Sequence, residues 1–134
     1  MSESNKKVVL DLMQNLSNGH WEAAFDALTD DAVWWVPPMP QPLTKAQFKE
    51  VCLQAHRIYR GKPRTIPQRI TAEDDRVALE AESDAELSNG NHSHKHYHYL
   101  FVLRGGKVCE AREYMDTKHA AEAFGDLLPA GKNG

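Results

Sequence analysis

The sequence predicts an α+β domain in which helices pack on one face of a curved antiparallel sheet. Apolar residues recur at helical spacing through residues 8–59, whereas from Arg64 onward they alternate as they do in strands. Two hairpin signals, Asn89-Gly90 and Gly105-Gly106, divide the alternating half into consecutive strands. Because the helices gather before the strands instead of alternating with them, this order indicates the α+β class.

The first half of the chain contains three predicted helices and one strand. Val8, Leu12 and Leu16 lie on one face of a first helix, a short second helix follows over residues 21–28, and residues 32–36 form a strand. Thr44 and Gln47 have the spacing of a capping box, so they predict the start of a third helix, which Gly61-Lys62-Pro63 ends. The buried stripe of this third helix comprises Phe48, Val51, Cys52, Ala55 and Tyr59.

The second half predicts four strands and a last helix. Residues 65–71 form a weak strand that Pro67 confines to a sheet edge. Residues 76–87 alternate, with Val77, Leu79, Ala81, Ala85 and Leu87 on one face and Glu80, Glu82, Asp84 and Glu86 on the other. A histidine-rich strand and a final strand follow, joined at the two glycines. Asp116 then caps a short helix.

Composition limits the kinds of partner. The chain has 134 residues, which suffices for one domain over residues 1–134 with an ordered core over about 5–127. A net charge of −3 provides no strong positive field for nucleic acid or an anionic membrane. The polar start predicts neither a signal peptide nor a membrane span. Cys52 and Cys109 form no Cys-x-x-Cys pair, and we expect reduced thiols in a cytoplasmic protein.

The histidine-rich strand places four histidines at alternate positions, 92, 94, 96 and 98. On a regular strand they share one face, with neighbours roughly 6.5–7 Å apart, and His-x-His is a familiar arrangement for zinc or nickel. A zinc site normally recruits a further ligand from elsewhere in the chain, so we expect no metal. The register that puts Tyr97, Tyr99 and Phe101 inside puts the histidines on the outer face. Near a dimer interface they would make association sensitive to pH near 6.

Three short motifs carry a family resemblance: residues 28–34 (LTDDAVW), 101–108 (FVLRGGKV) and 112–117 (REYMDT). With the order of elements from Val8 to about Gly125, they resemble the SnoaL-like, ketosteroid-isomerase-like branch of the nuclear-transport-factor-2-like superfamily. The resemblance implies a cone-shaped sheet wrapped around the N-terminal helices, with an apolar cavity that binds a small molecule. It also implies a homodimer through the outer sheet face. No cofactor is implied.

The residue set of the ketosteroid isomerases is not intact. By resemblance, their carboxylate base falls on Val36, their helix tyrosine on Leu12 and their oxyanion-binding aspartic acid on Tyr99. Only Tyr99 keeps a hydrogen-bond donor. Steroid isomerisation by that mechanism is therefore not expected.

The residue set of the limonene-epoxide hydrolases is also incomplete. The positions similar to their Asp-Arg-Asp set hold Glu82, Glu80 and Glu113, and their water-binding pair falls on Trp34 and Val36. An acid has replaced the arginine, and the water-binding pair is missing. Acids crowded together raise one another's pKa, so one of the three glutamates would still be able to donate a proton.

Two carboxyl groups remain that the resemblance directs into the cavity, Glu82 and Glu113. In an apolar site such a pair divides into one acid and one base, while Tyr99 or Tyr97 donates to a developing oxyanion. We therefore predict cofactor-free isomerase, cyclase or hydrolase chemistry on a hydrophobic or cyclic molecule. The predicted catalytic residues are Glu82, Glu113 and Tyr99; the predicted ligand-binding residues are Trp34, Val36, Glu80, Tyr97, Phe101, Ala111 and Met115.

Two alternatives stay open at this point. The polar face of an alternating strand usually meets solvent, so Glu80 and Glu82 would lie outside the cavity. The second alternative is a non-catalytic module of the same fold that binds a ligand or only another chain.

Overall fold

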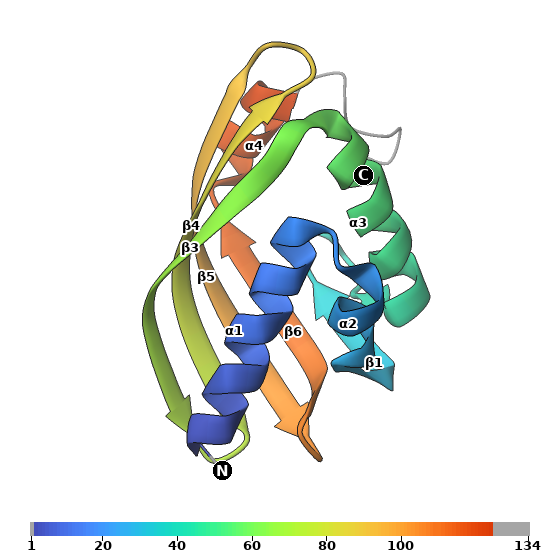
Figure 1. The fold of residues 1–134 in the computed structure, drawn as a ribbon, viewed down its shortest axis with the longest axis vertical. Coiled ribbons are helices and arrows are strands. Elements are labelled where there is room, and N and C mark those ends of the chain that lie inside the picture. The colour runs from blue at the N-terminus through green and yellow to red at the C-terminus, as the bar shows by residue number, and fades with distance from the viewer. Residues whose placement is uncertain (1, 125–134) are drawn as a thin grey trace.

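The computed structural model describes residues 2–124 as a curved six-stranded sheet with the first three helices on its concave side (Figure 1). The sheet order is β2-β1-β6-β5-β4-β3. The α+β prediction is confirmed, while residues 125–127 of the predicted core lie outside the described part. The elements are α1 (Ser2–Asn18), α2 (Trp21–Asp26), β1 (Leu28–Trp35), β2 (Leu43–Thr44), α3 (Lys45–Ile58), β3 (Tyr59–Glu73), β4 (Arg76–Leu87), β5 (His92–Arg104), β6 (Lys107–Met115) and α4 (Thr117–Phe124).

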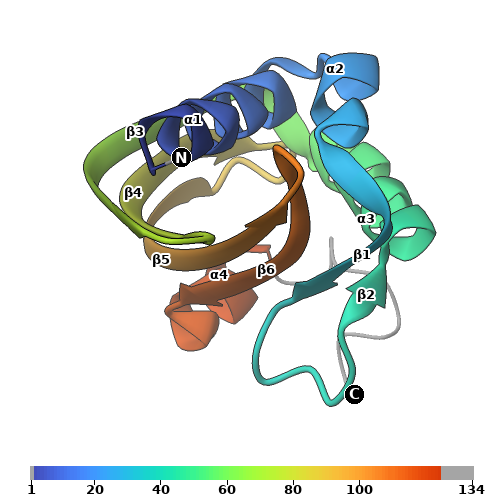
Figure 2. The same cartoon turned by 90° about the horizontal axis from the view of Figure 1, so that it is seen from below.

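Helix α1 fills the concave side of the sheet (Figure 2). Its apolar stripe, which includes Val9 and Leu12, is fully buried against sheet residues such as Leu79 and Phe101. Apolar residues from helix and sheet thus share one core, as the two periodicities in the sequence require. None of the helices in the described range has the length and hydropathy needed to cross a bilayer.

The sheet is antiparallel except where β1 meets β6. Those two strands pair in parallel, with Trp34 opposite Ala111. This differs from the all-antiparallel prediction, because β1 reaches its neighbour through the long connection that includes α3 and β3–β5, whereas hairpins join only neighbours in sequence. Strand β3 lies at the sheet edge, as Pro67 predicted.

Two helix boundaries decide which residues reach the cavity. The capping box at the start of α3 is present: the backbone N–H of Gln47 donates to the Thr44 hydroxyl at 3.2 Å, and the Thr44 N–H donates to the Gln47 side chain at 2.9 Å. The helix ends at Ile58, earlier than predicted, and Tyr59 begins β3 with extended backbone angles, φ −79° and ψ 144°. Tyr59 is therefore a strand residue whose phenol reaches the cavity, not a member of the helical stripe.

The β5–β6 hairpin turns at Gly105 and Gly106, whose φ angles of +60° and +80° lie in the left-handed region that glycine adopts without strain. Along β5 burial alternates, so Ser93, Lys95 and Tyr99 are buried and the histidines are exposed. The predicted register of the hairpin, with tyrosines inward and histidines outward, is confirmed.

Candidate active site

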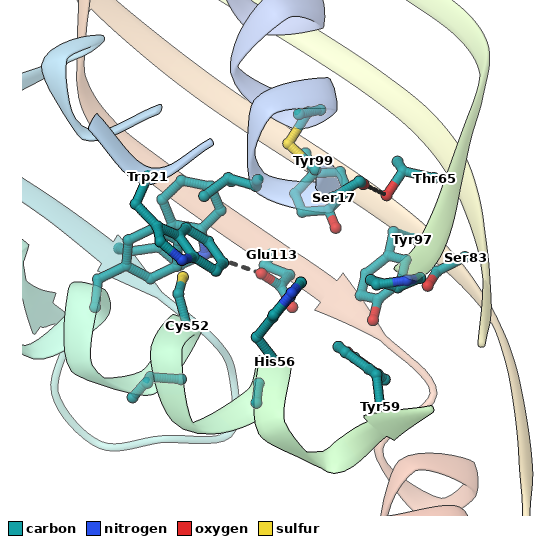
Figure 3. Close-up of a pocket in the computed structure, with 17 residues that line it drawn as sticks. Ser17, Trp21, Cys52, His56, Tyr59, Thr65, Ser83, Tyr97, Tyr99 and Glu113 are labelled. Atoms are coloured by element: carbon teal, nitrogen blue, oxygen red, sulfur yellow. Dashed lines mark hydrogen bonds between the residues drawn. The ribbon is translucent and has the colours of Figure 1, made fainter. Parts of the chain in front are cut away.

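A cavity of about 180 Å³ lies between α1, α3 and the concave face of the sheet. Trp34 and Phe48 provide much of its apolar wall. Glu113 projects from β6 into the space between α3, which carries Cys52 and His56, and β5, which carries Tyr97 and Tyr99 (Figure 3). A pocket that combines aromatic and aliphatic side chains with one carboxylate and several hydroxyl groups is typical of a small-molecule site.

The strand ladder fixes the backbone of Glu113, and one hydrogen bond orients its carboxylate. Its strand position lies opposite Tyr99 in the β5–β6 ladder, and the Trp34 Nε1–H donates to its Oε1 at 2.9 Å. The Trp34 ring is itself fixed, because it stacks on Phe48 with 4.0 Å between ring centroids and meets Phe101 edge-on. One carboxylate oxygen is thus oriented by a rigid donor, as catalytic carboxylates require.

Burial is the main cause of the shifted pKa values among the cavity side chains. It raises the pKa of Glu113, while the Trp34 hydrogen bond and the charge of Lys95 act in the opposite direction. Burial, followed by the Glu113 charge, raises the pKa of Tyr59 and of Cys52 to about 12 and that of Tyr97 and Tyr99 well above the usual range. The phenols therefore remain protonated hydrogen-bond donors near neutral pH. The pKa of Glu113 lies closer to neutral pH than that of an ordinary glutamate.

Lys95 is a buried cation that sequence analysis missed. Its side chain is only 6% exposed, and its Nζ lies 5.3 Å from the ring centroid of Tyr97. Burial lowers its pKa, whereas the Glu113 charge raises it. The signal was present in the sequence, since the alternation that places Tyr97 and Tyr99 inside also places Lys95 inside.

Glu82 and Glu80 lie on the outer face of the sheet, which corrects their predicted position. Glu82 pairs with His96 across β4 and β5, and its Oε1 lies 3.1 Å from the Nε2 of His94 and 3.5 Å from the Nε2 of His96. The Oε2 of Glu80 lies 4.0 Å from the Nε of Arg69. Strand alternation puts both on the face opposite Ala81 and Leu79, which are buried. Glu82 and Glu113 therefore do not form one acid–base pair.

The remaining predicted residues divide by location. Trp34, Tyr97 and Tyr99 line the cavity with Glu113. Phe101 and Ala111 are fully buried in the core and are not part of its lining, and Val36 packs against the edge of that core. Met115, at the end of β6, pairs with Tyr97 and is half-buried, but it is not part of the cavity lining.

Several polar lining residues escaped sequence analysis: Ser17, His56, Tyr59, Thr65 and Ser83. Tyr59 was assigned to the wrong element. Ser83 occupies an inward position of β4, and alternation from Ala81 would have found it. Within residues 2–124, the two groups of three side chains positioned to share a metal ion both lie outside this cavity.

Comparisons with known proteins agree with this geometry. A family model described as a SnoaL-like domain matches residues 9–111. A search of curated protein sequences finds no significant match.

Three solved structures show the same fold at low identity. PrhC from Penicillium brasilianum is 13% identical, with a TM-score of 0.85 over 98% of this chain and 91% of its own. IdmH from Streptomyces antibioticus, assigned as a polyketide cyclase, is 16% identical, with a TM-score of 0.80 over 90% and 98%. An epoxide hydrolase of the limonene type from M. tuberculosis is 15% identical, with a TM-score of 0.77 over 94% and 96%.

Proposed function

Because the chain belongs to the SnoaL-like domain family, we propose that its cavity binds a compact cyclic organic molecule and catalyses a proton transfer on it without a cofactor. A volume of about 180 Å³ favours a small ring system, since an apolar cavity of about 150 Å³ holds benzene. The neighbours assigned as a polyketide cyclase and an epoxide hydrolase act within the same fold. The proposal is consistent with both.

The observation that carries the proposal is the environment of Glu113. This carboxylate lies inside the cavity, Trp34 holds its Oε1, and burial raises its pKa. A general base works best when its pKa lies near the working pH, and burial is the usual means of moving a glutamate in that direction.

The proposed step begins when the free oxygen of Glu113 removes a proton from a carbon next to a ligand carbonyl. The electron pair moves onto the carbonyl oxygen, where Tyr97 or Tyr99 donates a hydrogen bond to the enolate. The nearby charge of Lys95 favours the same anion. Glu113 then returns the proton to the same or another atom of the ligand, so the enzyme is regenerated without a redox change.

Deuterium exchange tests this step without knowledge of the natural substrate. Cyclopentanone, cyclohexanone and 2-tetralone are incubated with the protein in D₂O, and loss of the proton next to the carbonyl is followed by ¹H NMR. We expect Glu113→Gln to slow the catalysed exchange at least ~100-fold while ligand-observed NMR still detects binding. Tyr97→Phe and Tyr99→Phe should each slow it about 10-fold or more.

Glu110→Gln provides the matched control, because Glu110 lies on the same strand and contacts Arg112 rather than the cavity. Exchange that survives Glu113→Gln, or that falls equally in Glu110→Gln, would reject Glu113 as the base. Binding of a ketone with no exchange in the unaltered protein would instead support the alternative of a non-catalytic ligand-binding module.

A homodimer through the outer sheet face and a cytoplasmic location remain predictions. Sedimentation velocity over a range of protein concentrations checks the first, with a monomer at all concentrations as the contradicting result. Fractionation of the producing cells checks the second.

A further inference from the structure

The outer face of β4 and β5 carries a cluster of imidazoles and carboxylates that the proposed reaction does not use. Glu82 and Asp84 project from β4, and His92, His94 and His96 project from β5. The β4–β5 ladder pairs these positions directly, with Glu82 opposite His96, Asp84 opposite His94 and Glu86 opposite His92, and β3 pairs with the other side of β4. Their backbones therefore hold these side chains at fixed spacing, which is a property of preorganised metal sites.

Three of these side chains already have the spacing of ligands around one ion. Glu82 Oε1 lies 3.1 Å from His94 Nε2 and 3.5 Å from His96 Nε2. Tetrahedral zinc with bonds of about 2.0–2.1 Å separates its ligand atoms by roughly 3.3 Å. The cross-strand glutamate thus supplies the further ligand that the His-x-His motif lacks on its own.

A second layer of contacts orients these groups. The Nδ1 of His94 lies 3.4 Å from Asp84 Oδ1, while its Nε2 faces Glu82. A histidine that binds a metal through one nitrogen and donates to a carboxylate through the other is a recurring arrangement, because the carboxylate fixes the tautomer and the ring. On the opposite side, the Gln68 amide donates to Glu82 Oε2, which leaves Oε1 turned toward the histidines.

The position of Gln68 has a structural cause. The β3–β4 register shifts between Pro67 and Arg69, so Gln68 is an extra residue in β3. Bulges of this kind re-aim a side chain. Here the bulge directs an amide onto the outer face, against Glu82.

A rival set of Asp84, His92 and His94 also falls within reach of one ion. It would use His94 through Nδ1, and a neutral imidazole has only one nitrogen available for a metal. The two sets therefore compete for His94, and the first is favoured because Asp84 and Gln68 orient two of its members.

We propose that Glu82, His94 and His96 bind one Zn²⁺ or similar divalent transition-metal ion per chain on the outer sheet face, with Asp84 as a hydrogen-bond partner of His94. Two imidazoles and a carboxylate suit zinc and leave a fourth coordination position open toward solvent.

The test measures Zn²⁺ binding to protein made without an affinity tag and stripped with a chelator, by competition with a chromogenic chelator at pH 7.5. We expect one Zn²⁺ per chain and, with Co²⁺, the visible absorption of a four-coordinate site. Glu82→Ala, His94→Ala and His96→Ala should each weaken binding at least ~100-fold, and Asp84→Asn about 10-fold.

His98→Ala and His92→Ala are the matched controls and should change the affinity less than about threefold, since they remove exposed histidines from the same strand face. Circular dichroism confirms that each variant is folded. Equal affinity of His94→Ala and His98→Ala would overturn the site. Loss of binding in His92→Ala with retention in His96→Ala would overturn the ligand set in favour of the rival.

Discussion

The two faces of β4 and β5 place similar chemical groups in opposite environments. On the concave face, Glu113 of the neighbouring strand lies with Tyr97 and Tyr99 in the cavity beneath α1 and α3, and Lys95 is buried on the same face. On the convex face, Asp84 and the histidines meet solvent. Neighbouring residues of one strand therefore belong to different chemical sites.

The two faces move carboxylate pKa values in opposite directions. Burial raises the pKa of Glu113, whereas the hydrogen bond from His92 lowers that of Asp84; desolvation opposes this effect and a weaker hydrogen bond from His94 adds to it. A raised pKa suits proton transfer, because the group exchanges protons near neutral pH. A lowered pKa suits cation binding, because the group stays ionised. The contrast separates a site for chemistry from a site for a metal or a charged partner.

The largest expected difference between the faces is in stability. Phe101 is fully buried on the concave side, so Phe101→Ala should lower the free energy of unfolding by about 3–5 kcal/mol. His98→Ala, on the convex side of the same strand, should change it by less than about 0.5 kcal/mol. Urea titrations of both variants make the comparison. Equal losses would mean that the convex face is also packed, as a dimer interface would be.

A smaller effect of opposite sign is expected for Glu113→Gln. The folded-state pKa of Glu113 is raised above its ordinary value of 4.5, so the stability linked to this group is fully present below that value and is lost as pH rises through the folded-state pKa. Removing the charge should therefore stabilise the protein at pH 7, by roughly 1.4 kcal/mol for each unit by which the pKa of Glu113 is raised. The amide oxygen can still accept from Trp34.

The measurement is the difference in unfolding free energy between Glu113→Gln and the unaltered protein from pH 4 to pH 8. The difference should grow with pH and then level off. Glu110→Gln serves as the control for loss of one acidic charge. A difference independent of pH would contradict a raised pKa for Glu113.

The smallest effect concerns His94 in metal-free protein. Hydrogen bonds to Glu82 and then Asp84 raise its pKa, so Asp84→Asn should lower that pKa toward its ordinary value. A ¹H–¹⁵N NMR titration of the imidazoles measures the change. Glu86→Gln, on the same face of β4, should leave the His94 titration unchanged, and an equal shift in both variants would indicate only a general effect of surface charge.

Alternation in the sequence was sufficient to predict which face each hairpin residue occupies. Tyr97, Tyr99 and the histidines were assigned correctly because a strand with one buried face fixes its own register. The same rule places Glu82 outside and Lys95 inside. Glu82 was misplaced because family resemblance was given more weight than alternation, and Lys95 was overlooked because lysine is rarely buried.

Other parts of the site depend on tertiary structure that local patterns do not contain. Tyr59 has the spacing of a helical residue, and only the strand pairing of β3 with β4 shows that it is extended. The Trp34–Glu113 hydrogen bond joins residues 79 positions apart and requires the parallel β1–β6 pair. That pairing depends on the path of the chain between the two strands, so the sequence pattern predicted the strands but not this contact.

The extra residue Gln68 shifts the inward–outward alternation of β3 by one position. Before the bulge, Thr65 faces the cavity; after it, Ile70 and Ala72 pack on the core, so the inward positions change from odd to even numbers. If the same residues formed a regular strand without the bulge, either Thr65 or Ile70 would point to the outer face. Deleting Gln68 would therefore remove both the bulge and the amide beside Glu82, and it would leave a regular strand in which Thr65 and Ile70 keep their inward positions.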